Sequence, residues 1–95
     1  MRSHSKAQRI LDAQARLRSL RQEGAVIKEQ AAAFQEIADD LRLRQLLAET
    51  PLSQKEYSEA KRHADAANRA TDRLELQALE VEEQINQMLK DLEVV

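Results

Sequence analysis

Residues typical of a helix seam recur along this chain at alternating steps of three and four, once on each side of Pro51. The first series is Ile10, Ala13, Leu17, Leu20, Gly24, Ile27, Ala31, Phe34, Ala38, Leu41, Gln45 and Ala48. The second series is Tyr57, Ala60, Ala64, Ala67, Thr71, Leu74, Ala78, Val81, Ile85, Met88, Leu92 and Val95. An unbroken repeat of this length predicts two helices that pack along a common seam.

The pattern therefore predicts an all-α fold, a long antiparallel two-helix hairpin of the coiled-coil type. We expect a single helical-hairpin domain over residues 1–95, with a first helix at about 5–49, a turn at 50–53 and a second helix at about 54–95. Two such hairpins are expected to pair into a four-helix bundle.

The start of the second helix can be read in two ways. Ser53 and Glu56 fit the capping box S-x-x-E, in which each side chain binds a backbone N–H of the first turn. Thr50, directly before Pro51, is a competing cap that would start the helix about three residues earlier. Either start leaves a short connection, which is typical of antiparallel neighbours.

Gly24 is the only glycine of the chain. Inside a helix it costs about 1 kcal/mol relative to alanine, so a break at this point would give three helices instead of two. The repeat passes through Gly24 without a change of phase, and no polar loop follows it. These two observations favour one continuous helix.

The register of the hairpin follows if Ala48 faces Tyr57 across the turn. Large residues then mostly meet small ones, which is how a closely packed seam avoids voids. The resulting pairs include Phe34–Thr71, Gly24–Val81, Leu20–Ile85 and, beside the seam, Ile37–Ala70. Gly24 is then expected to provide the space for Val81.

Charge supports an antiparallel arrangement. Residues 1–28 hold seven Lys/Arg and two Asp/Glu, whereas residues 72–95 hold two Lys/Arg and seven Asp/Glu. A hairpin lays these segments side by side, and the expected ion pairs are Arg21–Glu82, Lys28–Glu75 and Arg16–Asp91. Two chains could satisfy the same match, so a domain-swapped dimer remains an alternative.

Composition excludes several function classes. The chain has no cysteine, which rules out disulfides and thiolate metal sites, and its formal net charge of −2 argues against a protein that coats nucleic acid. We expect no signal peptide and no membrane span, and hence a cytoplasmic protein. His4 and His63 are the only histidines, and His63 lacks the Glu-x-x-His spacing of a di-iron bundle. No catalytic, metal-binding or cofactor-binding residue is predicted, so the chain is not expected to be an enzyme.

Apolar residues that the seam does not use are the strongest functional signal. They gather near the turn and in a second stripe beside the seam, and surplus apolar surface on a small protein is typical of a binding site. The predicted partner-binding residues are Val26, Ala33, Ile37, Leu43, Leu46, Leu47, Leu52, Ala66 and Ala70.

The sequence thus predicts a non-enzymatic coiled-coil interaction module, a scaffold, adaptor or regulatory subunit, that self-associates as a homodimer and binds a protein partner. One alternative is a small nucleic-acid-associated regulator that uses the basic N-terminal part of the first helix. A second alternative is a secretion-system chaperone or substrate of the helical-hairpin type.

Overall fold

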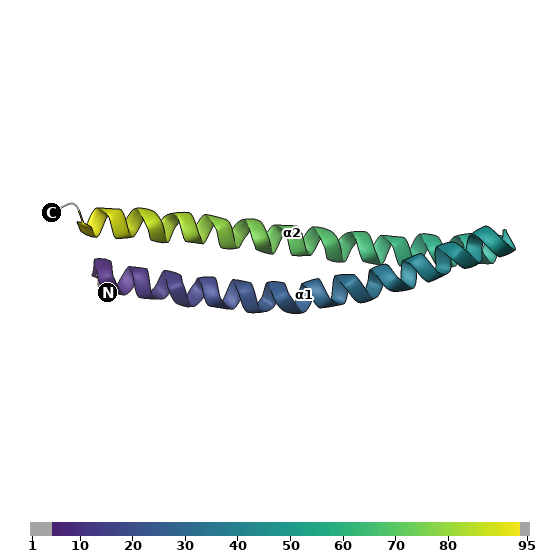
Figure 1. Cartoon of the computed structure of the whole chain (residues 1–95), viewed down its shortest axis with the longest axis horizontal. Helices are drawn as coiled ribbons and strands as arrows, with labels where there is room; N and C mark the ends of the chain where they lie inside the picture. The colour runs from purple at the N-terminus through teal and green to yellow at the C-terminus, as the bar shows by residue number, and fades with distance from the viewer. Residues whose placement is uncertain (1–4, 94–95) are drawn as a thin grey trace. The chain divides into compact units, whose positions relative to one another are not determined.

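The computed structural model describes residues 5–93 and contains two long helices joined by a short turn (Figure 1). Helix α1 spans Lys6–Ala48 and helix α2 spans Pro51–Glu93, and within the described residues only Ser5, Glu49 and Thr50 lie outside them. The helices pack as a hairpin, which confirms the predicted fold class. The expectations for His4 and Val95 concern positions outside the described residues.

Helix α1 begins with a capping serine and continues through the glycine. The Ser5 hydroxyl accepts a hydrogen bond from the Gln8 amide at 3.1 Å, and the Ser5 carbonyl accepts one from the Arg9 amide at 3.0 Å. These contacts satisfy amides that lack a partner within the helix. Gly24 lies in the middle of α1 without a positive φ, so the prediction of a continuous helix is confirmed.

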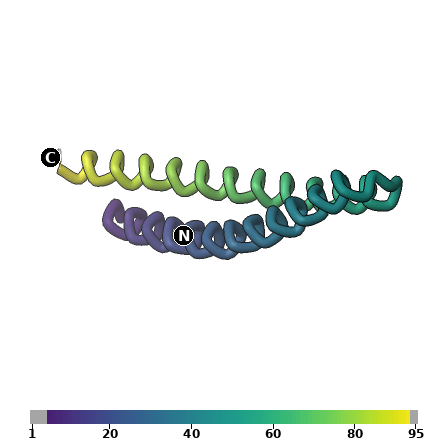
Figure 2. The backbone as a smooth tube through the Cα atoms, turned by 45° about the vertical axis from the view of Figure 1, so that its right-hand side comes forward, coloured from purple at the N-terminus to yellow at the C-terminus, as the bar shows by residue number. Residues whose placement is uncertain are grey.

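The turn joins the two helices at the teal end of the tube (Figure 2). It is shorter than the predicted 50–53, and α2 begins three residues earlier than about 54 because Thr50 is the capping residue. Thr50 Oγ1 accepts the Ser53 amide at 3.1 Å, and Ser53 Oγ accepts the Thr50 amide at 3.1 Å. Thr50 and Ser53 thus form the capping box, with Ser53 as its member inside the helix. The predicted capping box of Ser53 and Glu56 is wrong. The preset φ of Pro51 suits the first helical position, which favours the earlier start.

The end of α1 uses a left-handed residue. Glu49 has a φ of 51°, and its amide donates to the Gln45 carbonyl at 2.8 Å. This geometry is typical of a helix C-terminus, although glycine or asparagine usually occupies it. The two-residue turn of Glu49 and Thr50 then reverses the chain.

The shorter turn also changes the register. A β-carbon added to Gly24 would meet Leu74 Cβ at 3.9 Å, so Gly24 lies against Leu74 and the predicted contact with Val81 is wrong. Phe34 stacks on His63, which lies eight residues closer to the turn than its predicted partner Thr71. Leu74 and His63 both lie closer to the hairpin turn than the predicted partners Val81 and Thr71, by about two turns of helix. A shorter connection moves facing positions in this direction, although the predicted pair Arg21–Glu82 beside the seam is retained.

The chain divides into two compact units, each containing a segment of both helices. The terminal unit combines α1 up to Gly24 with α2 from Arg73 onward. Its core consists of buried Leu17, Val81 and Ile85, with Ala13, Leu20, Ala78 and Met88 packed against them. Arg21 donates to Glu82 across the seam, which confirms that predicted ion pair, whereas Lys28–Glu75 and Arg16–Asp91 are not paired within the described residues.

The turn unit, Ala25–Asp72, has a seam of small side chains. Its buried residues are Ala31, Ala38, Ala64 and Thr71. The Thr71 hydroxyl donates to the Ala67 carbonyl at 3.0 Å, so the one buried polar side chain of the turn unit has a partner. An alanine seam leaves little room for large side chains between the helices.

Candidate interaction surface

A groove in the turn unit is lined on its floor by apolar side chains from both helices. Phe34, Ile37 and Leu41 of α1 face Ala60 and His63 of α2 across it, and its volume is about 320 Å³. Its acidic margin consists of Glu56 and Glu59. Open apolar floors with a polar margin are typical of sites that bind another protein segment.

Phe34 is a member of this groove that the sequence pattern assigned to the seam. It keeps 39% of its surface exposed, and its ring lies 6.0 Å from the His63 ring with an interplanar angle of 24°. The neighbouring seam positions Ala31, Ala38 and Ala64 are almost fully buried. A phenyl ring does not fit between helices that alanine brings close together, so it lies beside the seam. The alanines flanking Phe34 were the sequence signal that could have revealed this.

Helical spacing extends the groove along the turn unit. On α1, steps of three and four lead from Ile37 to Ala33, Gln30 and Val26 in one direction and to Asp40, Arg44 and Leu47 in the other. On α2, the same steps lead from His63 to Ala66 and Ala70 and, through Glu59 and Glu56, back to Leu52. We call these two series, with Phe34, Leu41 and Ala60, the groove face.

Seven of the nine predicted binding residues belong to the groove face. Leu47 and Leu52 are 80% and 65% exposed, Val26, Ala33, Ile37 and Ala66 are also exposed, and Ala70 is half-buried. Ile37 lies across from Ala60 and His63, so its predicted partner Ala70 is wrong. Leu43 and Leu46 are also exposed, but they lie outside the two series of the groove face. That these residues bind a partner stays a prediction.

The opposite edge of the turn unit is polar. The Asn68 amide group donates to Gln35 Oε1 at 3.5 Å, and Arg42 donates to the Tyr57 hydroxyl at 3.2 Å. The Arg42 guanidinium also lies 5.6 Å from the centre of the Tyr57 ring, within the range of a cation–π contact. Side chains from both helices therefore satisfy one another on this edge, whereas the groove face is open.

Exposed leucines outside the predicted set occur in the terminal unit. They are Leu11, Leu76, Leu79, Leu89 and Leu92. The first four lie outside the predicted seam positions, so their exposure could have been predicted from the sequence. Single exposed leucines are normal on protein surfaces, and none of these five lines the groove of the turn unit.

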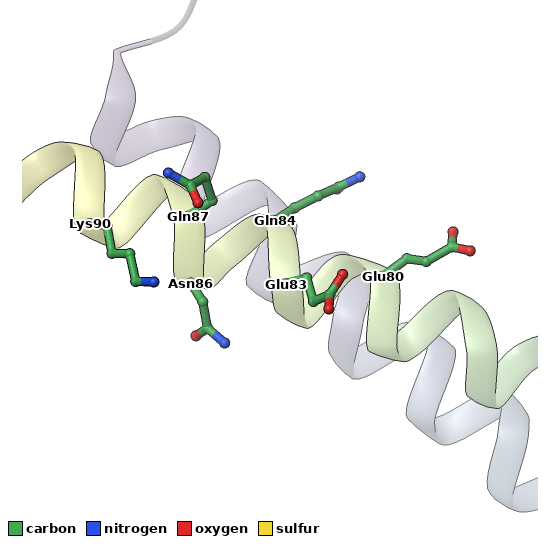
Figure 3. A pocket seen from close by; sticks show the side chains of 6 residues that line it. All are labelled: Glu80, Glu83, Gln84, Asn86, Gln87 and Lys90. Atoms are coloured by element: carbon green, nitrogen blue, oxygen red, sulfur yellow. The ribbon is translucent and has the colours of Figure 1, made fainter.

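A second hollow lies on the outer surface of α2 (Figure 3). Its six lining side chains, all polar and all from α2, are Glu80, Glu83, Gln84, Asn86, Gln87 and Lys90. The face of a single helix has no opposite wall to exclude water, so its carboxylates remain solvated. We assign no chemistry to this hollow.

The remaining predicted features have ordinary surroundings. Within residues 5–93, no three His or acidic side chains are grouped as metal ligands, and neither helix has an apolar stretch that could cross a membrane. His63 is exposed and stacks on Phe34. Of the basic residues near the start of α1, Arg21 is paired with Glu82.

The fold defines the chain as an all-α antiparallel helical hairpin whose turn unit has one apolar and one polar edge. Comparison with family models, with curated proteins and with solved structures finds no match to this chain.

Proposed function

We propose that this chain is a non-enzymatic coiled-coil interaction module that self-associates through its groove face. The observation that carries the proposal is the open apolar groove of Phe34, Ile37, Leu41, Ala60 and His63, which contains side chains from both helices. Large apolar side chains that remain exposed beside a seam of alanines are the surface that a second helical hairpin can cover. The expected assembly is a homodimer in the form of a four-helix bundle.

The expected affinity is modest. Ile37, Leu47 and Leu52 keep at least half of their surface exposed, so burying each contributes on the order of 1 kcal/mol. A dimer buries six such side chains together with the smaller groove residues. The free energy gained is comparable with the lower part of the association cost of about 4–15 kcal/mol. The small net gain predicts weak self-association that depends strongly on protein concentration, and the same surface would remain available to a scaffolded or regulated protein.

Light scattering over about 10–500 μM tests the proposal. The wild type is expected to approach the mass of a dimer with rising concentration. The double variant Ile37→Glu/Leu47→Glu places two charges in the groove face and should stay monomeric while retaining its helical circular dichroism, because unpaired charges are costly to desolvate.

Leu11→Glu/Leu79→Glu is the matched control, since both leucines are more than half exposed and lie in the terminal unit. It should dimerise as the wild type does. A wild type that stays monomeric throughout the range would overturn self-association. Dissociation by the control alone would move the interface to the terminal unit. A cytoplasmic location is part of the same proposal, and cell fractionation would check it.

A further inference from the structure

We propose that the second copy docks on the groove face with its turn at the same end, so that α1 of each copy lies against α2 of the other. This orientation rests on the proposed self-association and specifies the partner of that same surface. When two hairpins align their turns, residues that lie equally far from the turn meet. The orientation therefore follows from which residues of the turn unit lie at the same distance from the turn.

Observed contacts between α1 and α2 show which residues of the two helices lie level with each other, that is, at the same distance from the turn. Ile37 of α1 and His63 of α2 line the same groove, and Arg42 contacts Tyr57 nearer the turn. Since each helix rises about 1.5 Å per residue from the two-residue turn, Leu47 lies level with Leu52, and Arg44 lies close to the level of Glu56. All four belong to the groove face, where α1 residues would meet α2 residues of the partner.

Aligned turns give favourable pairs at most levels. Leu47 meets Leu52, Leu41 meets Ala60, and Ala33 meets Ala66, so apolar groups cover apolar groups. Arg44 meets Glu56, and two-fold symmetry creates this opposite-charge pair twice. Among residues 5–93 neither of these two side chains forms an ion pair, so each can contact the second copy.

Opposed turns give poorer pairs. Rotating one hairpin end over end about Ile37 and His63 places α1 on α1 and α2 on α2. Arg44 then lies over the neutral Gln30, and Glu56 lies over Ala70. No charge of the groove face gains a partner of opposite sign at these positions, and the acidic groups are covered by methyl groups.

Mixing two charge variants tests the orientation. The Arg44→Glu chain is acidic at both positions, and the Glu56→Arg chain is basic at both. With aligned turns, each homodimer brings like charges together and the heterodimer brings two opposite-charge pairs together. Native mass spectrometry of an equimolar mixture should show the heterodimer enriched by roughly threefold to tenfold over the statistical mixture. Contacts within one chain are the same in both kinds of dimer, so they cancel.

Cysteine cross-linking gives an independent readout, because the chain contains no cysteine of its own. A tagged Leu47→Cys chain mixed with an untagged Leu52→Cys chain should form the mixed disulfide under mild oxidation. Leu47→Cys with Val26→Cys reports opposed turns, since Val26 lies at the other end of the groove face. Leu46→Cys with Leu52→Cys is the matched control, because Leu46 lies off this face.

The like charges Asp40 and Glu59 provide a second prediction of the same orientation. They also lie level with each other, so aligned turns bring them together across the interface at some cost. Glu59→Gln should therefore tighten self-association about twofold to fivefold. Glu36→Gln, which removes the same charge from a side of α1 outside the groove face, should have a smaller effect.

The outcomes separate the two proposals. Heterodimer enrichment together with the Leu47–Leu52 cross-link supports aligned turns. A dimer without enrichment, in which Leu47 cross-links to position 26, overturns the orientation and leaves self-association intact. A wild type that stays monomeric, with no cross-link in any mixture, overturns both.

Discussion

The terminal unit and the turn unit share the same two helices and the same repeat, but they fill the seam differently. The terminal unit buries Leu17, Val81 and Ile85, whereas the turn unit buries Ala31, Ala38 and Ala64. Larger side chains remove more apolar surface from water, so the terminal unit gains more free energy of folding from its own seam.

The difference shows how a hairpin can separate stability from binding. In the turn unit the large side chains Phe34, Ile37 and Leu47 lie outside an alanine seam, at 39%, 51% and 80% exposure. Burial of these groups is left incomplete within the chain, so a partner can complete it. The polar contacts of Gln35 with Asn68 close only the opposite edge.

The largest expected effect comes from truncating the terminal core. Ile85→Ala should lower the free energy of unfolding by about 2–5 kcal/mol, because Ile85 is buried against Leu17 and Val81. Phe34→Ala removes a larger side chain from the turn unit, yet it should cost less because the ring is partly exposed. Urea unfolding at low protein concentration measures both. Equal losses would break the comparison between the units.

An overpacking variant probes the alanine seam from the other direction. Ala38→Leu should destabilise the protein by about 1–3 kcal/mol although it adds apolar surface, since Ala38 is only 2% exposed. Ala32→Leu, at an exposed position of the same helix, is the control and should be nearly neutral. A gain in stability from Ala38→Leu would show that the seam has room for a larger side chain.

A cap variant tests the start of α2. Thr50→Ala removes the oxygen that accepts the Ser53 amide, and it should cost about 1 kcal/mol. Glu56→Ala, which would be equally harmful if Ser53 were the cap, should change stability little. Thermal unfolding followed by circular dichroism compares the two. The opposite order would place the start of α2 at Ser53.

The smallest expected effect is a gain at the end of the terminal unit. Gly24→Ala should stabilise the protein by up to about 1 kcal/mol, because alanine favours the helix and its Cβ would meet Leu74 Cβ at an ordinary 3.9 Å. Differential scanning calorimetry should record a higher Tm. A lower Tm would mean that the helices cannot accept even a methyl group at this position.

The repeat alone determined most of the seam. Within the described residues, its positions are buried or half-buried except Phe34, Ala48 and Leu92. The continuity of α1 through Gly24 was also readable, because helical phase is a local property that one glycine does not interrupt. The exposure of the leucines near the turn could be predicted from the same repeat, since these leucines lie outside its positions.

The turn and the register were decided only by the tertiary structure. Two caps of similar strength, Thr50 and Ser53, competed for the start of α2, and the sequence offers both. The choice of Thr50 moved the seam partner of Gly24, because facing residues depend on the length of the connection and not on the period of either helix. The same choice placed Leu52 level with Leu47.

The groove face likewise needed both helices together. Sequence spacing places Ile37 and Phe34 on α1 and His63 on α2, but it cannot state which of them meet. The alanine seam excludes the Phe34 ring, which therefore stacks on His63 beside it. Periodicity determined which side chains belong to the seam, whereas the space between the packed helices decided which of them fit.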